Sequence, residues 1–307
     1  MSKKPPQSLW LDTDIGDDTD DILALTLILA SPELDLAGVS TVFGETEQRA
    51  RLAQTILQIN GRDDVSVSAG CGHPLLGTGI PEYLPNGPMS REPIAQGPCS
   101  FPSSRLPKLS KTHAVKHLAE HLLAYPGLTT PVAIGPLTNI ATLLLAEPDA
   151  ARTIPRLVVM AGEFKQTMWE WNIHCDPLAA ACVVESDLTI DFIPWDIGMI
   201  CTVNDPQVDR LFASRTQTGR LLTRAIKLWR KFKTIHQMPH LFDPMAVAVL
   251  THPHWFEWRR GRVSVSSSPD TFTHTHFTPD PKGPHRVAWG VNKSAAVRTV
   301  WSRILSL

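Results

Sequence analysis

A dense run of aspartates near the amino terminus constrains this chain more than any other feature. Six of the ten residues from 12 to 21 are aspartate. They follow a segment at 8–11 and lead into a segment at 18–30 that is apolar from residue 22 onward. We expect the first segment to be a strand and the second a largely buried helix. A helix start accounts for one or two aspartates, whose oxygens accept free backbone N–H groups, but not for six.

So many neighbouring carboxylates repel one another unless protons or a cation neutralise them. Asp12 and Asp14 are two residues apart at the end of the strand, so both should point to the same side. Ligands of open α/β sheets bind at such strand-to-helix junctions, and Ca²⁺ and Mg²⁺ prefer oxygen ligands. We therefore predict a metal site. The alternative, a solvated acidic turn that caps the helix, does not explain why the acids lie at this junction.

The segments that follow alternate between predicted strands and helices. This rhythm is typical of a parallel sheet covered by helices. We predict an α/β fold with an open, mostly parallel sheet, helices on both faces and one domain spanning residues 1–307. Residues 73–109 contain eight prolines and are expected to form a long loop. The predicted strands are 36–43, 65–69, 131–134, 157–160 and 189–193, and the further helices are 46–60, 112–124, 221–235 and 295–305.

Composition excludes several classes of function. A net charge of −1 gives no basic surface for nucleic acid and no attraction to a membrane surface. Five cysteines without a Cys-x-x-Cys pair suggest reduced thiols. Residues 1–7 are short and polar, and no stretch has the length of a membrane span. We expect a soluble, cytoplasmic protein.

Four separated motifs share one resemblance. They are Asp12-Thr13-Asp14-Ile15-Gly16 with Asp20-Asp21, Gly135-Pro136-Leu137-Thr138-Asn139, Glu170-Trp171-Asn172 and Phe242-Asp243-Pro244. Together they resemble the inosine–uridine-preferring nucleoside hydrolases. The resemblance implies a Rossmann-like fold, a nucleoside substrate, and hydrolysis of an N-glycosidic bond with a Ca²⁺-bound water. It also implies a homo-oligomer, a dimer or a tetramer.

The resemblance implies a role for each matching residue. Asp14 would be the general base, a choice that suits a carboxylate beside the attacking water. The ribose would contact Asp20, Glu170, Asn172 and Asp243, with Asp18 as the alternative to Asp20 because two extra residues precede the Asp-Asp pair. The calcium ligands would be Asp14, Asp21, Asp243 and the carbonyl of Thr138.

Two positions depart from the family pattern. Glu45 stands where the family has a substrate-facing asparagine, and Phe242 stands where it has the histidine that assists the leaving base. A phenyl ring cannot donate a proton, so another group must serve. His240 is our first candidate, and Glu45, His174 or an aromatic stack from Trp171 remain open. We expect Glu45 and Trp171 to contact the substrate in either case.

Two other functions fit part of the sequence. Asp12-x-Asp14 after a strand also suits a haloacid-dehalogenase-type phosphatase with Mg²⁺, but that reading leaves the later motifs unexplained. A non-catalytic, calcium-dependent ribose binder is suggested by Glu45 and Phe242. Separately, His113, His117 and His121 recur at helical spacing. Because no partner carboxylate accompanies them, we predict a solvated histidine stripe rather than a zinc site.

Overall fold

The computed structural model describes residues 5–76, 94–232, 238–268, 271 and 273–307. Its strands are β1 (Gln7–Thr13), β2 (Leu34–Thr41), β3 (Ser66–Ala69), β4 (Thr130–Ala133), β5 (Leu157–Met160), β6 (Ile190–Ile193), β7 (Phe256–Val265), β8 (Thr275–Pro279) and β9 (His285–Val291). Its α-helices are α1 (Asp20–Leu29), α2 (Thr46–Ile59), α3 (Ala114–Ala124), α4 (Thr138–Ala146), α5 (Pro148–Ala151), α6 (Trp171–Cys175), α7 (Pro177–Val184), α8 (Trp195–Ile200), α9 (Asp205–Phe212), α10 (Gln217–Phe232), α11 (Phe242–Thr251) and α12 (Lys293–Ile304).

The described strands form one sheet in the order β3-β2-β1-β4-β5-β6-β9-β7-β8. The first seven strands in this order run parallel, and β7 and β8 are antiparallel to their neighbours. β1 lies inside the sheet between β2 and β4, so the aspartates that follow it lie at its carboxyl edge, at the crevice where such sheets bind ligands.

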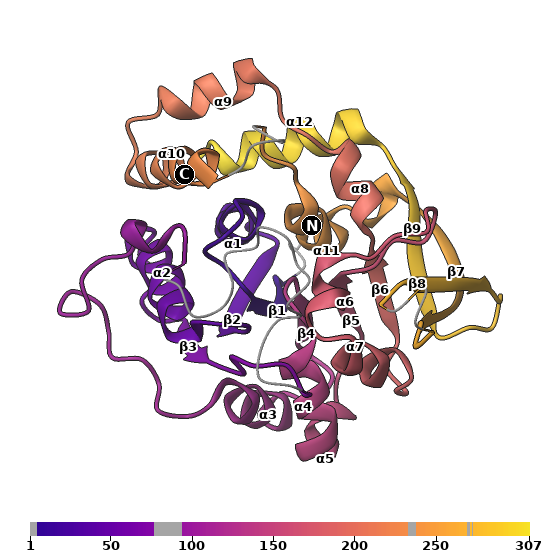
Figure 1. The fold of residues 1–307 in the computed structure, drawn as a ribbon. Helices are drawn as coiled ribbons and strands as arrows, with labels where there is room; N and C mark the ends of the chain where they lie inside the picture. The colour runs from indigo at the N-terminus through magenta and orange to yellow at the C-terminus, as the bar shows by residue number, and fades with distance from the viewer. Residues whose placement is uncertain (1–4, 77–93, 233–237, 269–270, 272) are drawn as a thin grey trace.

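Side chains of the central strands alternate between two hydrophobic cores. Leu9 and Leu11 of β1 face the core covered by α1, α2, α11 and α12 (Figure 1). Trp10, between them, faces the core covered by α3, α4 and α7. Both faces of the parallel strands are therefore buried, as a βα repeat requires. The predicted α/β fold with helices on both faces is confirmed.

Most of the predicted elements are present within a few residues of their expected ends. The strand at 157–160 has its predicted bounds, and the first helix begins two residues later than expected, at Asp20. The helix predicted at 221–235 is α10, which begins earlier, and residues 233–235 lie outside the described residues. The predicted loop at 73–109 contains a short 3-10 helix, Gly97–Cys99, and its residues 77–93 also lie outside.

The histidine stripe on α3 is not simply solvated. His113 caps the helix, accepting a hydrogen bond from the Val115 N–H. His117 and His121 are half-buried, with ring centroids 5.1 and 5.3 Å from that of Trp10. The prediction of a solvated stripe was wrong for these two rings because α3 turns them toward the sheet. In the part of the chain that the structure describes, no helix is long and apolar enough to cross a membrane.

Candidate active site

Three buried carboxylates meet at the carboxyl edge of the sheet. Asp20 and Asp21 lie in the first turn of α1, and Asp243 lies in the first turn of α11, which packs beside α1 (Figure 1). One oxygen from each carboxylate lies within 4.8 Å of the others. Their exposed fractions are 8, 4 and 2%. The helix starts hold these acids in place, because both helices direct their free N–H groups toward this edge.

The electrostatics of this trio favour a bound cation. Burial raises the pKa of Asp21 well above its usual range, and the neighbouring Asp14 and Asp20 raise it further. Burial raises the pKa of Asp243 in the same way, and Asp20, Asp21 and Asp14 add to the effect. Hard oxygen donors that repel one another in a buried site form a ligand set suited to Ca²⁺ or Mg²⁺. The residues present therefore fit the metal that the resemblance implies.

Asp14 lies just beyond the end of β1 and is half-buried. Burial raises its pKa to about 6, against the opposing effect of the Arg49 guanidinium. Gly135 follows β4, and a Cβ at this position would lie only 2.9 Å from Oδ1 of Asp14. The carboxylate of Asp14 is thus turned toward the end of β4, and the close approach requires glycine there. With a pKa near neutrality, Asp14 suits the role of a general base.

The remaining aspartates of the motif form hydrogen bonds or an ion pair with other groups of the chain. Asp12 is fully buried and accepts hydrogen bonds from Ser40 and from Asn139 Nδ2, the latter at 2.7 Å. Burial raises its pKa to about 7, so it carries a proton more readily than an ordinary aspartate. Asp17 pairs with Arg49 at 2.7 Å, and Asp18 accepts the N–H of Thr19. Asp12 and Asp17 thus have structural contacts, while Asp18 as the alternative to Asp20 for the ribose contact stays a prediction.

Two of the predicted ribose contacts, Glu170 and Asn172, lie at the start of α6. Glu170 caps this helix and accepts the N–H groups of Gly162, Asn172 and Ile173 at 2.9 to 3.2 Å. The amide nitrogen of Asn172 donates to the carbonyls of Ile134 and Met160, at the ends of β4 and β5. Both side chains are 4% exposed and lie at the same sheet edge as Asp14. Their arrangement fixes the strand ends around the site.

Thr138 forms hydrogen bonds with a residue of its own helix and with the residue that caps α7. Its hydroxyl donates to Asp176 at 2.7 Å, and its carbonyl accepts the hydroxyl of Thr142 at 2.7 Å. Asp176 caps α7, as the Asp-Pro pair predicts. The role of Thr138 as a calcium ligand stays a prediction.

Aromatic side chains gather in two groups near these acids. Trp171 packs edge-on against Phe43, which has a positive φ of 69° at the end of β2. Phe242 stacks between Trp195 and His240, at centroid distances of 6.5 and 5.4 Å. His240 is half-buried, and its Nδ1 lies 2.9 Å from the Thr202 hydroxyl.

Glu45 and His174, the other candidate proton donors, lie on different elements. Glu45 precedes α2, and its Oε2 accepts the amide of Gln48 at 3.2 Å. His174 lies on α6, with its Nδ1 2.9 Å from the Thr273 hydroxyl. The structure thus leaves the choice between these donors to experiment.

Two functional residues went unnoticed in the sequence. Asn139 joins Asp12 to the carbonyl of Thr41 and to the N–H of Cys71, so one amide links three strand ends. Arg49 of α2 is 2% exposed and donates to the acidic turn. Asn139 stands inside a recognised motif, which was a usable signal. Arg49 stands among the polar residues of a helix, and nothing in that pattern singles it out.

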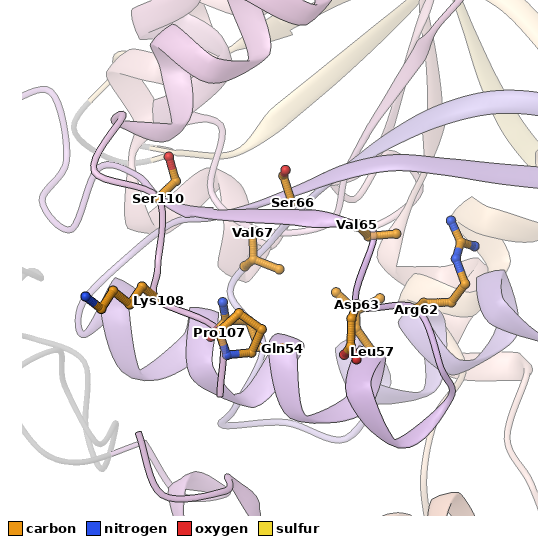
Figure 2. Close-up of a pocket in the computed structure, with 10 residues that line it drawn as sticks. All are labelled: Gln54, Leu57, Arg62, Asp63, Val65, Ser66, Val67, Pro107, Lys108 and Ser110. Atoms are coloured by element: carbon orange, nitrogen blue, oxygen red, sulfur yellow. The ribbon is translucent and has the colours of Figure 1, made fainter. Parts of the chain in front are cut away.

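A cavity of about 290 Å³ lies elsewhere, beside the start of β3 (Figure 2). It is bounded by α2 and by the chain at 107–110, and both apolar and polar side chains line it. The cavity flanks the first residues of β3, whereas the three carboxylates lie at carboxyl ends of strands. It therefore takes no part in the site described above.

Comparison with known proteins decides the family. The family model for the inosine–uridine-preferring nucleoside hydrolases matches residues 9–298. The chain belongs to this family. It is therefore an enzyme that hydrolyses the N-glycosidic bond of ribonucleosides.

Individual relatives agree with this assignment. The hydrolase is 27% identical to uridine nucleosidase 1 of Arabidopsis thaliana over 97% of its own length and 93% of the relative's. It is 29% identical to a pyrimidine-specific ribonucleoside hydrolase of Citrobacter koseri, over 77% of both chains. Its fold matches that of a purine-preferring ribonucleoside hydrolase from Gardnerella vaginalis with a TM-score of 0.84, over 98% of both chains, at 24% identity.

Proposed function

We propose that this nucleoside hydrolase is calcium-dependent and that Asp14, Asp21, Asp243 and the carbonyl of Thr138 ligate the metal, with Asp20 at the same centre toward the ribose. The observation that carries the proposal is the meeting of three buried carboxylates within 4.8 Å, at the sheet edge where ligands bind. Calcium held there would supply a cationic centre that makes water more acidic and attracts the ribose hydroxyls. The side chains around the metal supply the general base and the ribose contacts. We also propose that residues 1–307 form one domain.

Asp14 is the proposed general base. Its raised pKa, about 6, lies close enough to neutral pH for the carboxylate to accept a proton from water and return it. The acidic surroundings also stabilise positive charge that develops on the ribose ring as the C1′–N bond breaks. The same carboxylates thus serve two purposes, holding the cation and favouring the oxocarbenium-like transition state.

Substrate binding is assigned to residues around this centre. Asp20 and Asp243 bind ribose hydroxyls from the metal side. The carboxylate of Glu170 accepts hydrogen bonds from three backbone N–H groups. The amide nitrogen of Asn172 donates to two backbone carbonyls at strand ends. A ribose hydroxyl would therefore donate to the remaining lone pairs of these two side chains. Their fixed positions lower the entropy cost of orienting the sugar.

The base-binding side of the site is the least like the family pattern. Phe242 stacks between two rings and cannot protonate a leaving base. We propose His240 as the donor, with Glu45 and His174 as alternatives, and Trp171 as a surface on which the base stacks. The relatives have names that include uridine, pyrimidine and purine specificity, so the preferred base is left to experiment.

A panel of ribonucleosides with a reducing-sugar assay tests the function. We expect release of ribose from at least one natural nucleoside, loss of the activity after treatment with a chelator, and recovery on addition of Ca²⁺. His240→Ala should slow hydrolysis of that nucleoside by about 10²-fold while sparing a nitrophenyl riboside, whose leaving group needs no proton. Binding without ribose release would favour the non-catalytic binder that Glu45 and Phe242 suggest. The oligomeric state and cytoplasmic location stay predictions.

A further inference from the structure

Arg49 is a buried cation beside a site that we expect to bind another cation. It extends from the first turns of α2, and its side chain is 2% exposed. A fixed positive charge there repels an incoming Ca²⁺. Burying a guanidinium also costs free energy unless its donors are satisfied. The contacts that Arg49 makes must therefore account for its presence.

Most of those contacts are to main-chain carbonyl oxygens. Nε donates to the carbonyl of Phe43 at 2.6 Å. Nη1 donates to the carbonyls of Asp14 and Ile15, the latter at 3.1 Å. Nη2 pairs with the carboxylate of Asp17 at 2.7 Å. One rigid guanidinium thus ties the acidic turn after β1 to the turn after β2.

The turn after β2 is itself anchored, because the N–H groups of Phe43 and Gly44 donate to the carbonyls of Cys71 and Gly72, both at 2.8 Å, and Arg49 therefore holds the acidic turn to a fixed point. Phe43 and Gly44 both have positive φ values, 69° and 67°, so the chain leaves the extended conformation directly after β2. Asp14 also lies beyond the last paired residue of β1. Arg49 bonds to the carbonyl of Asp14 itself, so it fixes the main chain from which that carboxylate projects.

We infer that Arg49 is a positioning residue that holds Asp14 against the carboxylate trio before a metal ion binds. The inference rests on the proposed metal site. It assigns the effect to the carbonyl contacts rather than to charge, because only one of the four acceptors is a carboxylate. Lysine carries the same charge but has no planar fork, so it cannot reproduce contacts to three separate carbonyls.

The test is Arg49→Lys, compared with Arg51→Lys as a matched control. Arg51 lies on the same helix, its side chain is 40% exposed, and it pairs only loosely with Glu47 at 3.4 Å. The measurement is calorimetric titration of Ca²⁺ into chelator-treated protein, together with the melting temperature of the metal-free protein. We expect Arg49→Lys to raise the Kd for Ca²⁺ about 10-fold, as for other residues that orient metal ligands. Arg51→Lys should leave the Kd unchanged.

Asp17→Asn provides a second, milder variant. It removes the ion pair but leaves the carbonyl contacts, so the Kd should change by less than about 3-fold, a small fraction of what a lost ligand-orienting group causes. A wild-type Kd for Arg49→Lys, with or without a lower melting temperature, would overturn the inference, as would a 10-fold loss in Asp17→Asn. Wild-type protein that binds no Ca²⁺ would remove the proposed metal site itself, and the inference with it.

Discussion

Two of the regions in which this enzyme buries carboxylates surround them with different charges. Asp191 of β6 is fully buried and contacts two guanidiniums, Arg286 at 2.5 and 2.7 Å and Arg156 at 3.1 Å. The trio of Asp20, Asp21 and Asp243 is almost as buried but is crowded with further acids.

The cations near the two regions explain the difference. Arg156 and Arg286 both point their charged groups at Asp191. Arg49, the buried cation near the trio, bonds instead to carbonyl oxygens and to Asp17. Asp191 is thus paired with cations of the chain, while the acids of the trio repel one another, which favours protons or a bound cation there. The comparison teaches that burial alone does not identify a functional acid; the neighbouring charges matter, because two guanidiniums face Asp191 while further acids raise the pKa of Asp21 and Asp243.

The largest expected effect is on the rate of the reaction. Asp14→Asn keeps the shape of the side chain but removes its ability to accept a proton. We expect kcat to fall by about 10²–10⁴, the usual effect of losing a general base. The check is steady-state hydrolysis of the best natural nucleoside at saturating Ca²⁺. A variant with near wild-type kcat would exclude Asp14 as the base.

A change at the other region should affect stability and leave the chemistry unaltered. Asp191→Asn leaves two guanidiniums facing an uncharged amide. The free energy of unfolding should fall by about 3 kcal/mol, near the low end for a broken buried pair because both arginines keep some contact with water. Denaturant titration measures the loss. The kcat per folded molecule should stay at the wild-type value. A matching loss of kcat would contradict the purely structural role of Asp191.

A substitution within the trio should instead increase the free energy of unfolding of the metal-free protein. Asp21→Asn removes one of the mutually repelling acids, and the amide oxygen can still accept from the Thr13 hydroxyl. Without metal at pH 8, the variant should be more stable than wild type by about 1 kcal/mol, equivalent to somewhat less than one pKa unit. It should also lose Ca²⁺ binding. A destabilised metal-free variant would contradict the account of mutual repulsion among these acids.

The smallest effect concerns pH. Burial raises the pKa of Asp12 to about 7 and of Asp14 to about 6, so the folded state holds protons that the unfolded chain has released by about pH 4. Their contribution to metal-free stability is present at low pH and is lost as pH rises through 6 and 7. Of these two groups, Asp14 lies at the proposed metal site, so calcium must displace its proton in acid. The rise in melting temperature caused by saturating Ca²⁺ should therefore be larger at pH 8 than at pH 5.5, and an equal rise at both would argue against proton competition.

Much of the fold could be predicted because the parallel strands are short apolar runs between amphipathic or apolar helices. The three strands β7, β8 and β9 were not predicted. Their sequences carry arginines and histidines such as Arg259, Arg260 and His276, and only their packing against other elements makes them strands. Antiparallel pairing of β7 with β9 joins segments about 30 residues apart, which local periodicity does not reveal.

The candidate site could be located from sequence but not divided into roles. The pattern identified the acidic turn and Asp243, and it predicted that they come together. The sequence left Asp18 open as the alternative to Asp20 and gave Asp17 no role, whereas the structure pairs Asp17 with Arg49 and brings Asp20 into the trio. That distinction depends on the path of the turn and on which helix lies opposite, and both are set by tertiary packing.

The most direct measurement of the central claim is the stoichiometry of Ca²⁺ binding to chelator-treated enzyme. Calorimetric titration should show one ion bound per chain, and Asp243→Asn should abolish the binding while Asp191→Asn keeps it. Binding of no ion by the wild type, together with activity that survives the chelator, would contradict the claim that the buried trio holds a catalytic metal.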